Sequence, residues 1–298
     1  MSAQVVVGVD VGGTKTHVRA VPAAGAEPLV DVVVPTVGWD AVAADAAAWL
    51  ATTLREALAG HAPGVVVVGA HGVETPAHER TLGELVAADL GVPVTIVNDA
   101  ELVVPAAGLE SGVGVIAGTG AIVVGRGPDG ARLRAGGWGW VLSDDGSASA
   151  LVRDAVVALL RADDQGRPDV LLRDALLTAS GVADLGDLAH RLSWGGGTES
   201  WGELAPAVTR AAAHGSPLAA AALETGARGL AGYVRDLVGR GADGRDVVLA
   251  GGLLAALPEQ RERVADAVRE LVPGARVHHL AEPPVVGAVR LAQGVGPR

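Results

Sequence analysis

The chain contains no cysteine and no phenylalanine, and it has a single tyrosine and a single methionine among 298 residues. Without cysteine the protein has no disulfide, no thiolate zinc site and no cysteine-ligated iron–sulfur cluster. The absence of cysteine also favours a cytoplasmic location. Six tryptophans supply nearly all of the aromatic surface, so a tryptophan beside a polar loop is a candidate for a ligand contact.

Basic residues are also few. There are 23 Lys and Arg against 34 Asp and Glu, for a net charge of -11, and the basic residues form no run. This composition argues against a nucleic-acid-binding surface. The apolar stretches are short and interrupted by Asp, Arg and Gly, so none is long enough to span a bilayer. Residues 1–4 carry no charged segment ahead of the first apolar run, so no secretory signal is expected.

The order of the apolar segments predicts an α/β protein. A chain of 298 residues is long enough for two domains that each bury a core. Valine-rich runs alternate with segments of helical periodicity after an opening meander, which is typical of mixed sheets. Expected strands cover residues 5–10, 16–20, 28–35, 65–72, 94–99, 112–117, 121–126 and 247–250. Expected helices cover residues 42–58, 76–90, 148–160, 169–178, 182–192 and 218–238, and Asp40 can cap the first of them.

The first strand runs into a glycine turn that matches neither of the best-known phosphate motifs. Gly8 and Gly13 have the spacing of a Walker loop, but Thr14 stands where that motif requires lysine, and an alternating strand follows in place of a helix. The glycines also miss the spacing of the dinucleotide-binding fingerprint. The segment is therefore predicted to be a strand, a tight turn and a second strand.

This turn still has the chemistry of a phosphate site. The glycine pair at 12–13 allows backbone amides to approach a phosphate closely, and Thr14 and Thr16 flank Lys15 with hydroxyl donors. Asp10 ends the strand at the edge where α/β sheets collect ligands. A carboxylate beside phosphates usually implies Mg²⁺. The alternative is a plain hairpin in which Asp10 caps the turn.

A second carboxylate ends a later strand. Asp99 follows the apolar run at 94–98 and precedes a helical segment that starts at Ala100. Two interpretations remain open: Asp99 is the N-cap of that helix, or it is a general base that accepts a proton from an attacking hydroxyl.

The second half of the chain opens with the same pattern as the first. Residues 112–117 form an apolar run, Gly118-Thr119-Gly120 form a turn, and residues 121–126 alternate like a returning strand. Two similar units suggest a pair of related domains that hold phosphates between their turns. The alternative is two unrelated glycine turns in a chain with 43 glycines.

Five motifs in this order resemble the BadF/BadG/BcrA/BcrD ATPase family, and within it the N-acetylglucosamine and glucosamine kinases. The motifs are Gly8-Val-Asp-Val-Gly-Gly-Thr-Lys-Thr16, Val97-Asn-Asp99, Ala117-Gly-Thr-Gly120, Gly136-Gly-Trp-Gly-Trp140 with Ser143-Asp-Asp-Gly-Ser147, and Leu249-Ala-Gly-Gly252. The resemblance covers nearly the whole chain. It implies an α/β fold of two related actin-like (ribonuclease H-like) domains with mixed sheets and an ATP and sugar cleft between them. The domains are expected at 1–107 and 108–282, with a final helix at 283–298 that packs back on the first.

The resemblance also implies ATP and Mg²⁺ as cofactors. It assigns Asp10 to Mg²⁺ and Asp99 to the base that deprotonates the 6-hydroxyl of a sugar. It assigns ATP binding to two phosphate turns and an adenosine turn, which comprise Gly12, Gly13, Thr14, Lys15, Thr16, Gly118, Thr119, Gly120, Gly251 and Gly252. Phosphoryl transfer needs mainly alignment and charge neutralisation, which such groups supply.

Sugar binding is assigned by the same resemblance to loops in both halves. The implied residues are Trp39, Asp40, Asn98, Asp99, Gly120, Ala121, Gly137, Trp138, Gly139, Trp140 and Asp144. Core packing is the alternative for Trp138 and Trp140. For Asp144 and Asp145 the alternative is capping of the helix expected at 148–160.

The chain departs from the family pattern at several positions. Ser143 and Asp145 stand where the family usually has glycine and glutamate, and Ala121 stands where it often has serine. The asparagine of N-acetylglucosamine kinase sugar loops is missing from residues 35–40, where Asp40 offers a carboxylate instead. We hypothesise that this carboxylate favours the unacylated, positively charged amine of glucosamine.

The sequence therefore predicts an ATP-dependent kinase that transfers the γ-phosphate to the 6-hydroxyl of N-acetylglucosamine or glucosamine. A glucosamine-specific enzyme or an N-acetylmuramate-type hexosamine kinase is the alternative within this class. A non-catalytic sugar sensor also remains open, whereas an activator ATPase is disfavoured because it needs cysteines for its cluster. The expected partner is a small amino sugar, with no nucleic acid and no membrane, and a homodimer is left open.

Overall fold

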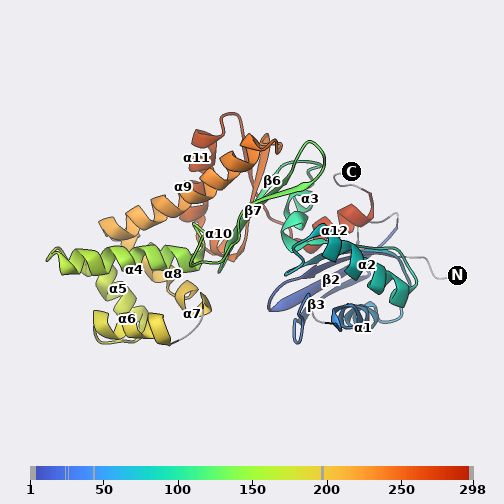
Figure 1. Ribbon diagram of the computed structural model, residues 1–298, viewed down its shortest axis with the longest axis horizontal. Helices are drawn as coiled ribbons and strands as arrows, with labels where there is room; N and C mark the ends of the chain where they lie inside the picture. The colour runs from blue at the N-terminus through green and yellow to red at the C-terminus, as the bar shows by residue number, and fades with distance from the viewer. Residues whose placement is uncertain (1–4, 24, 26, 43, 196–197, 295–298) are drawn as a thin grey trace. The chain divides into compact units, whose positions relative to one another are not determined.

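The computed structural model describes residues 5–23, 25, 27–42, 44–195 and 198–294. Residues 1–4, on which the signal prediction depends, and residues 295–298, the end of the expected final helix, lie outside this part of the chain. The chain divides into two compact units (Figure 1). The first comprises residues 1–114 and 278–298, and the second comprises residues 115–277. From the sequence, the boundaries between the two units were expected after residues 107 and 282.

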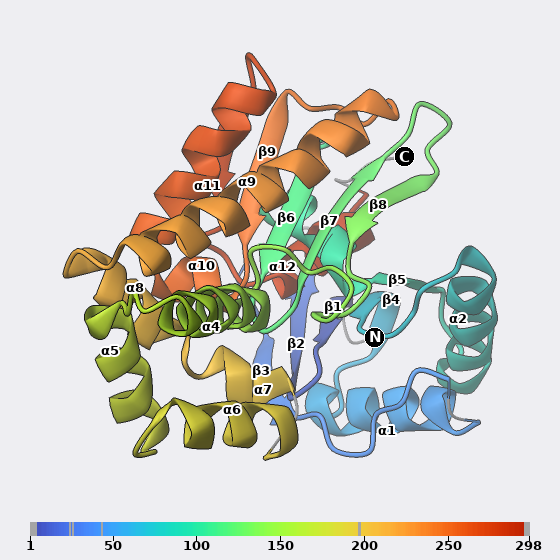
Figure 2. The ribbon, with the colours of Figure 1, turned by 60° about the vertical axis from the view of Figure 1, so that its left-hand side comes forward.

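The first unit is built on a five-stranded mixed sheet in the order β3-β2-β1-β4-β5 (Figure 2). Its strands are β1 (Val5–Val11), β2 (Lys15–Pro22), β3 (Val30–Pro35), β4 (Pro63–Ala70) and β5 (Val94–Asn98). The first three strands pair antiparallel as the predicted meander. The last two continue from β1 in parallel, so the sheet is mixed as the sequence predicts.

Helices cover both faces of this sheet, which explains why β1 has no polar side chain before Asp10. On one face Val7 and Val9 pack with the helices α1 (Ala46–Leu58) and α2 (Pro76–Leu90). On the other face Val6 packs with Val289 of the final helix. That second layer consists of η1 (Asp99–Leu102), α3 (Val103–Ala106) and α12 (Val285–Ala292).

The final helix α12 approaches the sheet so closely that two glycines are required. A Cβ added at Gly8 would lie 2.6 Å from the backbone nitrogen of Val289, and one at Gly287 would lie 2.1 Å from the carbonyl oxygen of Leu102. Arg290 Nη1 donates a hydrogen bond of 2.9 Å to the carbonyl of Pro105. The closing segment of the chain is therefore part of the core of the first unit.

The second unit contains another five-stranded mixed sheet, in the order β10-β9-β6-β7-β8. Its strands are β6 (Val113–Ala117), β7 (Ala121–Arg126), β8 (Arg132–Gly136), β9 (Asp246–Ala250) and β10 (Arg276–His279). Its helices are α4 (Ala148–Asp164), α5 (Val170–Ser180), α6 (Leu185–Trp194), α7 (Thr198–Gly202), α8 (Ala205–Ala213), α9 (Pro217–Gly239), α10 (Gly252–Ala256) and α11 (Pro258–Leu271). The long helix α9 packs against α11 (Figure 2). The predicted α/β fold of two mixed-sheet units is confirmed.

The structure corrects the expected start of the first helix. Periodicity predicted a helix from Val42 with Asp40 as its cap, but α1 begins at Ala46 and Val42 is exposed. Asp40 Oδ1 instead accepts a hydrogen bond of 3.1 Å from the backbone N–H of Val42, which closes a local turn. The sequence prediction also omitted β8, α7, α8 and α11. Within the described residues, no helix combines the length and the hydrophobicity needed to cross a bilayer.

Candidate functional site

Three parallel strands of the first unit end at one edge of its sheet. In the register of β1, β4 and β5, Asp10 pairs with Gly69 and Ala70 pairs with Asn98. The residues that follow β4 and β5, His71 and Asp99, therefore leave the sheet at the same edge as Asp10. Ligands of α/β sheets bind at this carboxyl edge.

The two carboxylates that the sequence singled out interact electrostatically. The pKa of Asp10 is raised from 3.8 to about 7, mainly by burial and in addition by the negative charge of Asp99, while Lys15 acts in the opposite direction. The structure therefore brings Asp10 and Asp99 into the same electrostatic environment, with Lys15 acting on it from the turn. A cation bound there would relieve the repulsion between the carboxylates.

Asp99 is the first residue of the short 3-10 helix η1, and its neighbour Asn98 occupies the N-cap. The Ala100 N–H donates to Asn98 Oδ1 at 3.1 Å and to Asp99 Oδ1 at 2.9 Å. Asn98 Nδ2 also donates to the carbonyl of Val73 at 3.0 Å, and the Asn98 side chain is buried. The Asn98 side chain is therefore held by the scaffold through both of its polar atoms, and its assignment to the sugar stays a prediction. Asp99 keeps Oδ2 for other partners.

The first glycine turn exposes most of its expected phosphate ligands. The Gly12 N–H donates to the Lys15 carbonyl at 3.0 Å, and residues 13–15 are exposed. Thr16 differs, because its side chain is fully buried and its hydroxyl bonds that of Thr36 at 2.8 Å. The Thr16 side chain therefore anchors the turn to the segment after β3, and its assignment as a phosphate donor stays a prediction.

The expected sugar loop of the first unit is tied to this turn. The Thr36 N–H donates to the Thr14 carbonyl at 3.0 Å. Trp39 is half-buried, with its ring centroid 5.2 Å from that of Trp49, and its Nε1 donates to the His71 carbonyl at 3.1 Å. Trp39 thus packs on the core of the first unit and joins the loop to the segment after β4.

The second unit brings its two glycine turns together. The Gly118 N–H donates to the Gly120 carbonyl at 2.9 Å, and the Ala148 N–H at the start of α4 donates to the Gly118 carbonyl at 2.8 Å. A Cβ added at Gly251 would lie 2.3 Å from the Ala117 carbonyl oxygen, and Gly251 has a φ of 103°. Only glycine allows this approach, so the turns assigned to phosphate and adenosine are neighbours.

Asp144 lies beside the same turn in a strained conformation. Its φ is +60°, a region that non-glycine residues occupy at a cost, and such strain gathers at functional sites. The buried carboxylate accepts from the Gly139 N–H at 3.2 Å through Oδ1. A Cβ added at Gly120 would lie 3.0 Å from Oδ2. Ala121, next in the chain, has a buried side chain, so only its backbone can contact a sugar.

The structure shows which residue caps α4, the role that was the alternative for Asp144 and Asp145. Ser147 caps α4, because its Oγ accepts from the Ala150 N–H at 3.1 Å. Asp145 accepts a hydrogen bond of 2.7 Å from the Tyr233 hydroxyl. Neither Asp144 nor Asp145 is therefore the cap.

The two tryptophans of the glycine-rich loop differ in environment. Trp138 is 63% exposed, and the guanidinium carbon of Arg134 lies 4.0 Å from its ring centroid, a cation–π contact. Trp140 packs on Trp201 with 4.8 Å between ring centroids. Trp140 is therefore half-buried against another half-buried tryptophan, whereas Trp138, between Gly137 and Gly139, is exposed and available for a ligand.

The donor set of the first unit fits a Mg²⁺ ion that is bound mainly through phosphates and water. Among the described residues, no group of three or more His, Cys, Asp or Glu side chains could by itself hold a metal. Mg²⁺ commonly uses one or two carboxylates and completes its coordination with phosphate and water. Asp10, with its raised pKa, is a carboxylate whose charged form such a cation would stabilise.

His71 is a residue that sequence reasoning missed. Its Nδ1 lies 3.7 Å from Asp99 Oδ2, and the Asp99 side chain raises the pKa of His71 above its usual value. The available signal was a histidine directly after a buried strand, at the edge where Asp10 and Asp99 were already placed.

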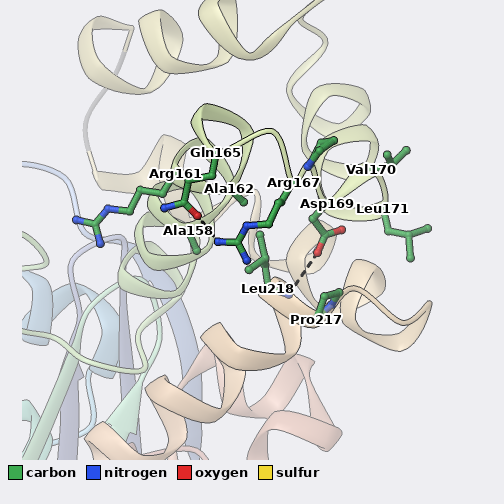
Figure 3. Close-up of a pocket in the computed structure, with 11 residues that line it drawn as sticks. Ala158, Arg161, Ala162, Gln165, Arg167, Asp169, Val170, Leu171, Pro217 and Leu218 are labelled. Atoms are coloured by element: carbon green, nitrogen blue, oxygen red, sulfur yellow. Dashed lines mark hydrogen bonds between the residues drawn. The ribbon is translucent and has the colours of Figure 1, made fainter.

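A cavity of about 690 Å³ lies elsewhere in the second unit, between α4, α5 and α9. Asp169 at its wall accepts hydrogen bonds from Ser216 Oγ at 2.7 Å and from the Leu218 N–H at 3.3 Å. Figure 3 shows the guanidinium of Arg161 pointing away from that of Arg167, so the cavity has no convergent charged groups. None of the predicted site residues lines it.

Comparison with known proteins identifies the family of this chain. The family model of the BadF/BadG/BcrA/BcrD ATPase family matches residues 7–292. The N-acetyl-D-glucosamine kinase of Dictyostelium discoideum is 27% identical over 319 aligned positions, which cover 98% of each chain. The N-acetylmuramic acid/N-acetylglucosamine kinase of Clostridium acetobutylicum is 40% identical over 86 residues, 28% of each chain.

Solved structures show the same fold. A candidate N-acetylglucosamine kinase from Chromobacterium violaceum superposes with a TM-score of 0.72 at 25% identity, covering 98% of this chain and 100% of that one. A ROK family glucokinase from Streptomyces griseus, solved with glucose and AMPPNP, gives a TM-score of 0.58 at 19% identity, covering 97% and 99%. Since the family model spans nearly the whole sequence, the chain belongs to the BadF/BadG/BcrA/BcrD ATPase family.

Proposed function

We propose that this protein is an ATP-dependent amino-sugar kinase that transfers the γ-phosphate to the 6-hydroxyl of a hexosamine. The observation that carries the proposal is the position of Asp10 and Asp99 at the same edge of the first sheet, where the charge of Asp99 helps to raise the pKa of Asp10. Phosphoryl transfer requires a cation site and a base near each other, and these two carboxylates supply both. Similarity to an N-acetyl-D-glucosamine kinase over 98% of the chain supports the substrate class.

Each proposed group has a distinct role. Asp99 accepts the proton of the attacking hydroxyl through Oδ2, while its Oδ1 is held by the Ala100 N–H. Asp10 holds Mg²⁺, which when bound neutralises phosphate charge. The exposed turn at 12–15 and the turn at 118–120 offer backbone N–H groups to phosphates, and the pair at 251–252 leaves room for a nucleoside against the backbone.

Candidate sugar contacts lie in each unit. In the first unit the proposal retains Asp40 and Asp99 at the edge of the sheet. In the second unit it retains Trp138 and Asp144, together with the backbone of the loop from Gly137 to Gly139. Trp39 and Trp140 support these contacts by packing on Trp49 and Trp201, respectively.

The proposed activity is tested by ADP release over a panel of sugars. We expect ATP to be consumed only when a hexosamine is present, with N-acetylglucosamine or glucosamine above N-acetylmuramate and glucose. Phosphate on the 6-hydroxyl, identified by NMR of the product, confirms the position of transfer. Sugar binding without ADP release would identify a sensor, and ADP release that no sugar stimulates would identify an ATPase of another kind.

The identity of the sugar that accepts the phosphate is tested by a substitution at Asp40. Replacement by asparagine keeps the Oδ1 acceptor for the Val42 N–H and removes the charge. We expect kcat/KM for glucosamine to fall about fivefold, as for loss of an exposed ion pair, with N-acetylglucosamine turnover unchanged. Asp45→Asn is the matched control, because Asp45 makes no side-chain capping bond. If wild type prefers the acetylated sugar and Asp40→Asn changes nothing, the glucosamine hypothesis is wrong.

A further inference from the structure

The backbone of His71 is fixed on two sides. Its N–H donates to the carbonyl of Val11 at 2.9 Å, and its carbonyl accepts the indole N–H of Trp39 at 3.1 Å. The first bond joins His71 to the end of the strand that carries Asp10, and the second joins it to the loop that carries Asp40. The point from which the His71 side chain leaves the backbone is therefore held by the scaffold on both sides.

The imidazole of His71 faces one particular oxygen of Asp99. His71 Nδ1 lies 3.7 Å from Asp99 Oδ2, whereas Asp99 Oδ1 accepts the Ala100 N–H at 2.9 Å. The side chain of His71 is 64% exposed and that of Asp99 is 31% exposed, so a small ligand can reach the space between them. The separation is longer than a hydrogen bond, and a modest movement of either side chain closes it.

Several acidic groups surround this imidazole. Asp99 raises the pKa of His71 through its carboxylate, partial burial lowers it, and the charge of Glu74 in the segment after β4 raises it further. Other ionisable groups on the neighbouring segments include Asp10 at the end of β1, Lys15 in the turn after it and Asp40 next to Trp39. Asp99 and Glu74 are carboxylates, so the protonated imidazole offsets part of their negative charge.

We propose that His71 is the positioning residue of Asp99, and that its imidazole holds Oδ2 of this carboxylate until a sugar hydroxyl takes its place. The inference rests on the proposed kinase function, because it gives Oδ2 the task of accepting the hydroxyl proton. It adds to that function a residue that contacts the base and orients it. A catalytic carboxylate is effective only when it is held in the correct direction.

A pH dependence follows from this arrangement. The protonated imidazole holds Oδ2 firmly and competes with the hydroxyl, whereas the neutral imidazole still orients Asp99 and releases it more easily. The pKa of His71 is raised above its usual value, so kcat/KM for the sugar should increase as the pH rises through and above neutrality. With Mg²⁺ at a saturating concentration, which would keep Asp10 ionised, this increase depends on His71, and removing the His71 side chain should abolish it.

The pairing is measured first without turnover. In an NMR titration of the intact protein, Asp99→Asn is expected to lower the pKa of His71, because the facing charge is removed. Adding glucosamine or N-acetylglucosamine to the wild type should lower it as well, since the hydroxyl takes Oδ2. A His71 titration that Asp99→Asn leaves unchanged overturns the pairing, whatever the protein does with sugars.

Kinetics then test the role. At about pH 8, His71→Ala is expected to lower kcat/KM for the sugar about tenfold, roughly the loss of one hydrogen bond, while KM for ATP stays the same. Its kcat/KM should also lack the wild-type increase between about pH 6 and about pH 8. His61→Ala, which removes an exposed histidine after α1, is the matched control and should behave as wild type.

The outcomes separate the two proposals. A His71→Ala variant with the wild-type pH profile overturns the positioning role even if the kinase activity is confirmed. If His71 titrates as expected but no hexosamine is phosphorylated, the kinase proposal fails, and the role of His71 in it fails as well. A uniform fall in both kcat and ATP binding would indicate general damage to the structure and would also overturn the positioning role.

Discussion

Replacing Asp99 with asparagine is expected to abolish sugar-dependent ADP release while leaving sugar binding largely intact. Asparagine keeps the Oδ1 acceptor for the Ala100 N–H, so η1 should retain its start. It cannot accept the hydroxyl proton, and removal of a general base typically slows a reaction by about 10²–10⁴-fold. Single-turnover phosphoryl transfer and calorimetric titration with the sugar measure the two effects separately.

The control for Asp99→Asn is a carboxylate in the same unit with no proposed role. Asp89 forms an ion pair of 2.8 Å with Arg55 on the surface, and Asp89→Asn should leave turnover close to wild type. If Asp99→Asn turns over at the wild-type rate, Asp99 is not the base. Loss of sugar binding together with turnover would instead make Asp99 a binding residue.

Replacing Asp10 with asparagine is expected to have opposite effects on activity and stability. Activity should fall to background, because the proposed ligand of Mg²⁺ is lost. The free energy of unfolding of the metal-free protein should increase at about pH 8. The pKa of Asp10 is raised from 3.8 to about 7 in the folded protein, so ionising it costs the folded state on the order of 2–4 kcal/mol.

The direction of the pH dependence follows from proton linkage. Between pH 3.8 and about 7, the folded protein retains a proton on Asp10 that the unfolded chain has released. Stability therefore decreases as the pH rises through this window, and above it the loss is complete. Asp10→Asn removes this contribution, so its advantage over wild type should be small at about pH 4 and largest at about pH 8.

Urea unfolding at several pH values, without Mg²⁺ or nucleotide, measures this difference. Asp99→Asn serves as a second comparison, because the charge of Asp99 contributes to the raised pKa of Asp10. The free energy of unfolding of Asp99→Asn should therefore vary less with pH than that of the wild type. If wild type and Asp10→Asn lose stability in parallel as the pH rises, the carboxylate is ionised at no cost and the proposed coupling is wrong.

Sequence alone predicted the central strands and the turns between them. The run from Val5 is apolar at every position, and only a strand covered on both faces accommodates it. The glycine turns were also predicted from the sequence. At Gly251 the structure shows the reason for glycine, since the backbone approach there allows no side chain. The helix from Pro76 to Leu90 was predicted with its observed bounds, since proline at its start and Gly91 after its end mark both termini.

Other elements were missed or misplaced because local signals were weak or misleading. Asp40 has the residue type of a helix cap, but it closes a turn with Val42 ahead of the helix. Strand β8 carries alternating basic residues and ends in the glycines of the tryptophan loop, so its pattern was obscured. Helix α11 is largely polar, and its few buried positions, such as Val264 and Val268, become evident only against α9.

The sequence by itself determined which residues have the chemistry of a kinase site: Asp10 and Asp99 at strand ends, and glycine turns beside them. Only the tertiary structure decided which of these side chains are free to act. Thr16 and Asn98 have suitable groups, but their burial and their bonds to Thr36 and Val73 commit them to the scaffold. The tertiary structure also brought His71 to this site, because it places His71 Nδ1 3.7 Å from Asp99 Oδ2. Hydrogen-bonding partners far apart in the chain are set by strand register and packing, which local sequence patterns do not encode.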